Sequence, residues 1–109
     1  MDYLKNEKDP EELQPEVKLW RAVLSKAFED VLYRGLERPL IVYKNEAHMW
    51  FVEKSEDFDY VCYCSLFEPE YISDKYFTML ESGKIKFTKK QIEYLKWRKI
   101  YDQRRNKNK

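Results

Sequence analysis

Aromatic and basic residues alternate in the last quarter of the chain, and their spacing places the rings on one side of a helix. Tyr94, Trp97 and Tyr101 fall at positions i, i+3 and i+7, which at 100° per residue span about 60° of arc. Lysine and arginine side chains lie close to that arc. Rings interleaved with cations can stack on nucleic-acid bases while the cations hold phosphates.

The same stripe has a second interpretation, in which it packs on a hydrophobic core. Ile92, Leu95 and Ile100 would then broaden the buried face. Because aromatic stripes at helical spacing are usually core residues, we expect this stripe to be buried.

The charge of the chain is divided unevenly along its length. Residues 84–109 hold eleven Lys or Arg and two acids, a net charge of +9, whereas residues 1–83 hold ten basic and eighteen acidic residues, a net charge of −8. Such asymmetry indicates an acidic partner for the basic part, either nucleic acid or a membrane surface. A solvated final helix, neutralised by the acidic remainder of the molecule, explains the same pattern.

The elements that must position these residues are helices. The apolar spacing predicts a helix over about 15–33, with Pro15 in its first turn and Gly35 and Pro39 after its end. Leu40–Tyr43 is either a brief strand or the entry to a helix for which Asn45 offers an N-cap.

Residues 55–81 predict a helix, a tight break and a second helix, with Ser55 as N-cap. This order suits a helix-turn-helix unit, whose second helix can enter a major groove, and it equally suits a plain α-hairpin. That second helix carries four acids against Lys75, so cations for phosphate contacts must come from the last helix. Thr88 is expected to cap that last helix, over about 89–104.

The length of 109 residues fits one domain. We predict a mainly all-α fold, a compact domain of four to five helices over 15–105 with a helix-turn-helix-like unit. Leu40–Tyr43 and Ile85–Phe87 would pair if a minimal two-stranded ribbon forms. Residues 1–14 are expected to be a flexible acidic arm, and 106–109 a basic disordered tail.

The sequence contains no motif that would predict an enzyme. It has no glycine-rich phosphate loop, no paired nucleophile and base, and no cluster of metal ligands. His48 is a lone histidine, which favours a packing or surface role, and Cys62 and Cys64 favour burial as small apolar residues in a reducing cytoplasm. No apolar run is long enough for a membrane span, and the start of the chain lacks a signal-peptide pattern. We expect a cytoplasmic protein without enzymatic activity, cofactor or metal.

Three stretches of the sequence, 19–24, 46–51 and 57–72, together form a pattern that resembles one in other small proteins. They contain a Trp-Arg helix, an Ala-x-x-Trp helix and a Phe-x-x-Val-Cys helix followed by an acidic-Pro turn. This pattern resembles a group of small proteins of bacteriophages and prophages. The resemblance implies a phage-derived helical protein with a helix-turn-helix-like unit, and it carries no assigned activity. Ser65 and Phe67 stand where that group tends to have small residues, and the second helix is more acidic here than in the group.

Two functional hypotheses follow. The first is a non-enzymatic nucleic-acid-binding protein of phage or mobile-element origin, and a homodimer would favour this hypothesis. The second is a protein-interaction module that docks on a host protein through its acidic face. The residues expected to contact nucleic acid under the first hypothesis are Lys89, Lys90, Tyr94, Lys96, Trp97, Arg98, Lys99, Arg104 and Arg105 of the last helix, with Tyr71, Ser73 and Lys75 of the preceding one.

Overall fold

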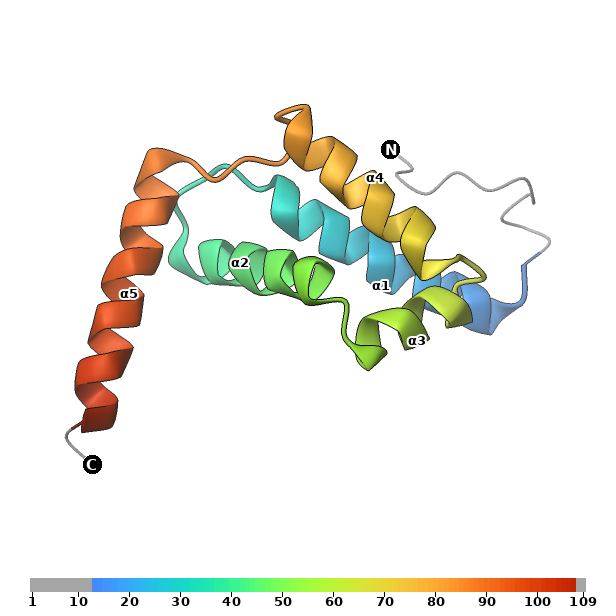
Figure 1. The fold of residues 1–109 in the computed structure, drawn as a ribbon, viewed down its shortest axis with the longest axis horizontal. Coiled ribbons are helices and arrows are strands. Elements are labelled where there is room, and N and C mark those ends of the chain that lie inside the picture. Colours follow the sequence, from blue (N-terminus) through green and yellow to red (C-terminus); the bar gives the residue numbers. More distant parts are fainter. Residues whose placement is uncertain (1–12, 108–109) are drawn as a thin grey trace.

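The computed structural model describes residues 13–107, which form five helices and no strand (Figure 1). The helices are α1 (Pro15–Leu32), α2 (Arg38–Glu53), α3 (Glu56–Cys64), α4 (Pro69–Glu81) and α5 (Lys89–Lys107). The all-α prediction is confirmed. The expected arm and tail fall largely outside the described residues, except that α5 continues through residues 106 and 107.

The ribbon considered from the sequence does not form within residues 13–107. Leu40–Tyr43 belongs to α2, because Pro39 lies in the first turn of that helix, where a missing N–H costs no hydrogen bond. Asn45 is therefore inside the helix and does not cap it. Ile85 is buried in the segment between α4 and α5, where its N–H donates to the Met79 carbonyl at 3.1 Å.

Local signals set several helix ends as expected. The Ser55 hydroxyl accepts a hydrogen bond from the Phe58 N–H at the start of α3. At the start of α5, the Thr88 hydroxyl accepts from the Gln91 N–H, and the Gln91 side chain accepts from the Thr88 N–H. This reciprocal pair is a capping box with glutamine at its third helical position.

Aromatic side chains from four helices fill the core. The rings of Phe51 and Tyr76 are stacked with centroids 4.3 Å apart, and Phe28 lies 4.7 Å from Phe51. Phe58 is likewise fully buried. Cys62 is buried among these groups, and its burial raises the pKa of the thiol to about 12. The predicted role as a small, buried apolar residue is confirmed for Cys62, whereas Cys64 is only half-buried.

The segment 55–81 folds as two helices joined by a tight turn. Leu66 adopts a left-handed backbone with φ of 62°, and the Phe67 N–H donates to the Cys62 carbonyl at 2.9 Å. Arg21 of α1 secures the turn by donating to the Ser65 carbonyl and by lying over the Phe67 ring. The turn is thereby bound to the bundle as well as to its own helices.

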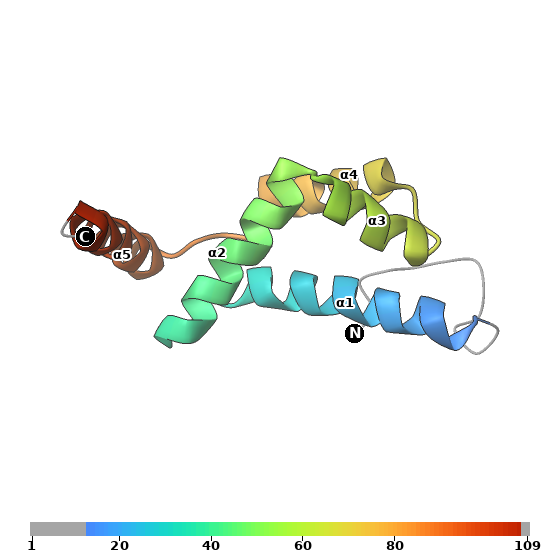
Figure 2. The ribbon, with the colours of Figure 1, turned by 90° about the horizontal axis from the view of Figure 1, so that it is seen from below.

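α5 stands apart from the other helices. It packs mainly on α2, whereas α1 packs on both α2 and α3. In Figure 1 and Figure 2, α5 lies at one end of the molecule and α3 and α4 lie toward the other. Much of the α5 surface is consequently open to solvent.

Replacing Ser55 by alanine is expected to lower the free energy of unfolding by about 1 kcal/mol, because the first turn of α3 loses its cap. Urea denaturation followed by circular dichroism measures the change. Ser25, inside α1, is the control, and its replacement by alanine should cost nothing comparable. Equal losses at the two serines would contradict the capping role.

Candidate nucleic-acid interface

A buried lysine anchors the start of α5. Lys44 of α2 is 0% exposed, and its ammonium group donates to the carbonyls of Tyr33 and Lys86 at 2.6 Å and to the Gln91 side-chain oxygen at 2.8 Å. The ammonium group also lies 4.5 Å from the centre of the Phe87 ring. We call Lys44, Gln91 and their hydrogen-bond partners the Lys44–Gln91 hub.

Gln91 completes this hub from the first turn of α5. Its amide nitrogen donates to the carbonyls of Tyr33 at 3.2 Å and Gly35 at 2.9 Å. The hub therefore joins the α1–α2 turn, the segment 82–88 and the beginning of α5. The Lys44 and Gln91 side chains at its centre are fully buried, and a bonded polar network around such groups favours one arrangement of its elements.

The electrostatics of the hub set the protonation of Lys44. Burial, with a smaller effect from the Arg34 charge, lowers the pKa of Lys44 to about 8. The three carbonyl-type acceptors keep the ammonium form hydrogen-bonded at neutral pH. Lys44 is not among the site residues predicted from the sequence, yet a signal was present, since Ile41, Lys44, His48 and Phe51 share the inner face of α2 by helical spacing.

The aromatic stripe of α5 is exposed, which corrects the expectation that it packs on the core. Trp97 is 53% and Tyr101 is 51% exposed, and only Tyr94 is half-buried. Ile100, expected to broaden a buried face, is 52% exposed. The physical reason is that rings from the first four helices already fill the core, so among residues 89–105 of α5 Gln91 alone has a fully buried side chain.

The exposed rings form an ordered row. The ring centroids of Tyr94 and Trp97 are 6.0 Å apart, those of Trp97 and Tyr101 are 5.4 Å apart, and the planes are nearly parallel in both pairs. The guanidinium of Arg38, from the start of α2, lies 5.4 Å from the centre of the Tyr94 ring and 5.9 Å from that of Trp97. Arg38, which sequence analysis did not select, thus adds a cation to the row.

Cations surround this row along α5. The exposed basic residues are Lys89, Lys90, Lys96, Arg98, Lys99, Arg104 and Arg105. Asp102 lies 3.8 Å from Arg98, and Glu93 is the other acid of the helix. The surface of α5 is therefore strongly positive and at the same time rich in flat apolar rings.

The site residues predicted on α4 do not join this surface. Ser73 is only 3% exposed, which corrects its assignment as a contact residue, because it faces the core beside Ile72 and Tyr76. Tyr71 is 44% exposed and stacks on Phe67, and Lys75 is half-buried. α4 lies away from α5 in both ribbon views (Figure 1 and Figure 2).

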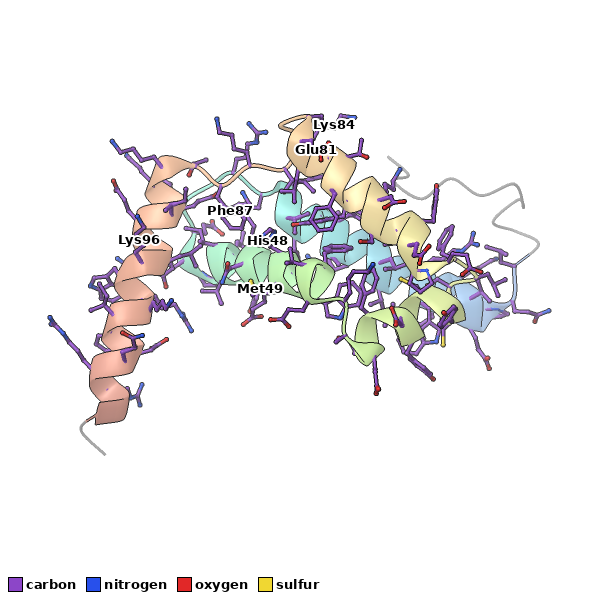
Figure 3. The ribbon with its side chains drawn as sticks, in the orientation of Figure 1. His48, Met49, Glu81, Lys84, Phe87 and Lys96 are labelled. Atoms are coloured by element: carbon purple, nitrogen blue, oxygen red, sulfur yellow. The ribbon has the colours of Figure 1, made fainter. Side chains whose placement is uncertain are left out.

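A groove of about 750 Å³ runs between α2 and α5. Its lining includes Met49 and His48 from α2, Phe87 from the segment before α5, and Lys96 from α5, as Figure 3 shows. His48 Nδ1 and the Tyr76 hydroxyl share a hydrogen bond of 2.5 Å. His48 is thus a packing residue that also contributes to a concave surface.

Lowering the pH from 7 to 5 is expected to destabilise the protein through His48. Burial, with a smaller effect from Lys44, lowers the pKa of His48 below its ordinary value of 6.5. The unfolded chain therefore binds a proton at a higher pH than the folded chain does, and stability is lost as the pH falls below about 6.5. Urea denaturation at several pH values measures this loss, and in the His48→Asn variant the dependence should be shallower. An unchanged pH profile in the variant would contradict the assignment.

Comparison with protein-family models, curated proteins and solved structures found no match. The resemblance to phage and prophage proteins stays a prediction. Within residues 13–107, no helix is both long enough and apolar enough to span a membrane. The same part of the chain has no group of three or more His, Cys, Asp or Glu side chains able to hold a metal ion.

Proposed function

We propose that the protein is a non-enzymatic nucleic-acid-binding protein and that α5 is its binding element. The observation that supports this most directly is the row of Tyr94, Trp97 and Tyr101, of which Trp97 and Tyr101 are exposed, on a helix covered with cations. Exposed rings are costly to leave in water, and a partner with flat faces and negative charge matches both properties of this surface. The resemblance adds the proposal that the protein is of phage or mobile-element origin.

Single strands suit this surface better than duplex DNA. Bases of a single strand are free to stack on aromatic rings, whereas those of a duplex are already stacked on one another. A duplex reader would also present cations on the second helix of the α3–α4 unit, and the exposed face of α4 instead carries Glu68, Glu70, Asp74 and Glu81. We therefore assign no base contact to α4.

The charge of the rest of the chain also favours α5 as the element that faces a nucleic acid. Residues 1–83 carry a net charge of −8, so phosphates are repelled from most of the molecule and attracted to α5. The hub holds α5 at its first turn, which leaves the row of rings facing solvent. If the protein is a homodimer, two such helices would be presented to one strand, and analytical ultracentrifugation would establish the stoichiometry.

Fluorescence anisotropy of the full-length protein with labelled single-stranded and duplex oligonucleotides tests the proposal at low and physiological salt. We expect tighter binding of the single strand, and weakening as salt rises. A variant in which Lys90, Arg104 and Arg105 are replaced by glutamine should bind weakly. Its matched control replaces Lys18, Lys54 and Lys75 of the bundle by glutamine, with the same change in charge. No binding of any oligonucleotide at low salt would overturn the proposal.

A second candidate function is docking on a partner protein through the acidic bundle. Leu19, Tyr60 and Tyr63 are 63%, 59% and 60% exposed on α1 and α3, where acidic side chains also lie. Exposed apolar side chains beside acids suit a basic, partly apolar protein surface. Under this candidate, Tyr63→Ala would abolish capture of the partner, and the α5 glutamine variant would retain it.

A further inference from the structure

We propose that the groove between α2 and α5 receives one unstacked base of a bound single strand, with its phosphate on the adjoining cations. This inference rests on the proposed function and specifies how the strand is held. The groove volume of about 750 Å³ lies within the range of about 300–1,000 Å³ for sites of small ligands.

The lining of the groove supplies apolar contacts for a flat ring. Val42 and Met49 from α2, Phe87, and Ile92 and Leu95 from α5 line it. Phe87 is held in place by His48, whose ring meets it edge-on at 5.4 Å, and by the Lys44 ammonium group at 4.5 Å. A fixed aromatic ring beside aliphatic side chains is the kind of surface on which a base stacks.

Polar groups in the same lining match the edge of a base. Asn45 from α2 and Gln103 from α5 both line the groove, and their side chains make no hydrogen bond among residues 13–105, whose side chains the structure describes. Amide side chains offer a donor and an acceptor together, which is the pattern that base edges present in return. A hydrocarbon chain would instead bury these amides unsatisfied, at a cost in free energy.

The first groove is lined by three cations, Lys96, Arg98 and Lys99, against the two acids Glu46 and Asp102. Cations continue into a second hollow of about 600 Å³, which shares Phe87, Ile92 and Lys96 with the first. Lys86 and Lys89 also line this second hollow, against a single acid, Glu93. A base in the first hollow would therefore have its phosphate within the positive field of the second. The arrangement fits a nucleotide, with a flat polar ring at one end and an anion at the other.

Methyl NMR of the full-length protein, labelled with carbon-13 at methionine methyl groups, tests the inference. Met49 lines the groove, whereas Met79 is buried in the core and serves as an internal control. A short oligo(dA) strand is expected to move the Met49 signal upfield through the ring current of the inserted base, and to leave Met79 in place. A strand of the same length without bases should leave both signals unmoved.

A pair of matched variants locates the effect in the groove. Ile92→Asp puts a negative charge into the groove, and Ile100→Asp puts the same charge on α5 at a residue outside the groove lining. Both residues are partly exposed, at 41% and 52%, so both variants are expected to fold. Only Ile92→Asp should lose the Met49 shift.

Several results would overturn the inference while the proposed function survives. They are strand binding by anisotropy without a Met49 shift, an equal shift with the base-free strand, and equal loss in the two aspartate variants. Adenosine monophosphate that shifts Met49 as strongly at the same nucleotide concentration would assign the groove to free nucleotides and would also overturn it. Decanoate that moves Met49 when oligo(dA) does not would identify an acyl site instead. Failure of the proposed function has a different signature, namely no anisotropy change with any strand.

Discussion

Replacing Lys44 by methionine is expected to lower the free energy of unfolding at pH 7 by about 2 kcal/mol. The variant loses three hydrogen bonds from the ammonium group and leaves the Lys86 carbonyl without the donor it has in the hub. Removal of a buried charge offsets part of this loss, because burial disfavours the charged form of Lys44. Urea denaturation measures the net effect, and hydrogen exchange should show faster exchange in the first turn of α5.

The pH dependence of stability separates the charge of Lys44 from its packing. The pKa of Lys44 is lowered from its ordinary value of 10.5 to about 8, so between these values the unfolded chain binds more protons than the folded chain. Stability must then rise with pH above about 8. Burial raises the pKa of Cys62 from 9.0 to about 12 and also raises the pKa of Tyr76, and both shifts make stability fall at higher pH.

Together these groups predict that stability rises with pH above about 8, where the unfolded chain keeps the Lys44 proton that the folded chain loses, and falls again once the Cys62 thiol of the unfolded chain ionises around its ordinary pKa of 9.0. The Lys44→Met variant should show no rise above pH 8 and only the later decline. Lys18→Met, at an exposed position on α1, is the control and should retain the maximum. If the Lys44→Met variant still becomes more stable as the pH rises above 8, a group other than Lys44 is responsible for that increase.

Replacing Trp97 by alanine is expected to weaken single-strand binding by roughly 5- to 150-fold, because one base–aromatic stacking contact contributes about 1–3 kcal/mol. Trp97 is the middle ring of the row and is 53% exposed, so its removal should leave the folded bundle intact. Ile100→Ala, at a residue 52% exposed on the same helix, is the matched control and should bind almost as the native protein does. Anisotropy titrations at constant salt make the comparison.

The salt dependence of binding reports the cations independently of the rings. The variant with glutamine at Lys90, Arg104 and Arg105 should reduce the slope of log affinity against log salt by about 2, since each phosphate contact on a single strand contributes about 0.7. Trp97→Ala should weaken binding without changing that slope. If the two variants change affinity and slope in the same proportion, rings and cations do not act as separate parts of the interface.

Deletion of α5 is a poorer experiment than these substitutions. A chain that ends at Gly83 would lack Gln91 and the Lys86 carbonyl, which supply two of the three acceptors of Lys44. A buried ammonium group with most of its partners removed destabilises the fold by several kcal/mol. Loss of binding by such a truncation would therefore not distinguish an interface from a folding defect.

The helices and many of their ends follow from signals local to the sequence. Ser55, Thr88 and the prolines act through hydrogen bonds or ring geometry within one turn, so their effects are readable from neighbouring residues. The division of charge was equally readable, because it depends only on composition along the chain. The alternative of a strand at Leu40–Tyr43 was wrong, because the apolar residues of this segment extend the helical pattern that reaches Phe51.

What each helical face contacts depends on how the helices pack, which local sequence signals do not contain. Periodicity places Tyr94, Trp97 and Tyr101 on one side of α5, but it contains no information on whether the core has room for them. Rings such as Phe51 and Tyr76 occupy that room, and the stripe is left in water. The same holds for the hub and the groove, which arise where residues distant in the sequence meet across α2 and α5.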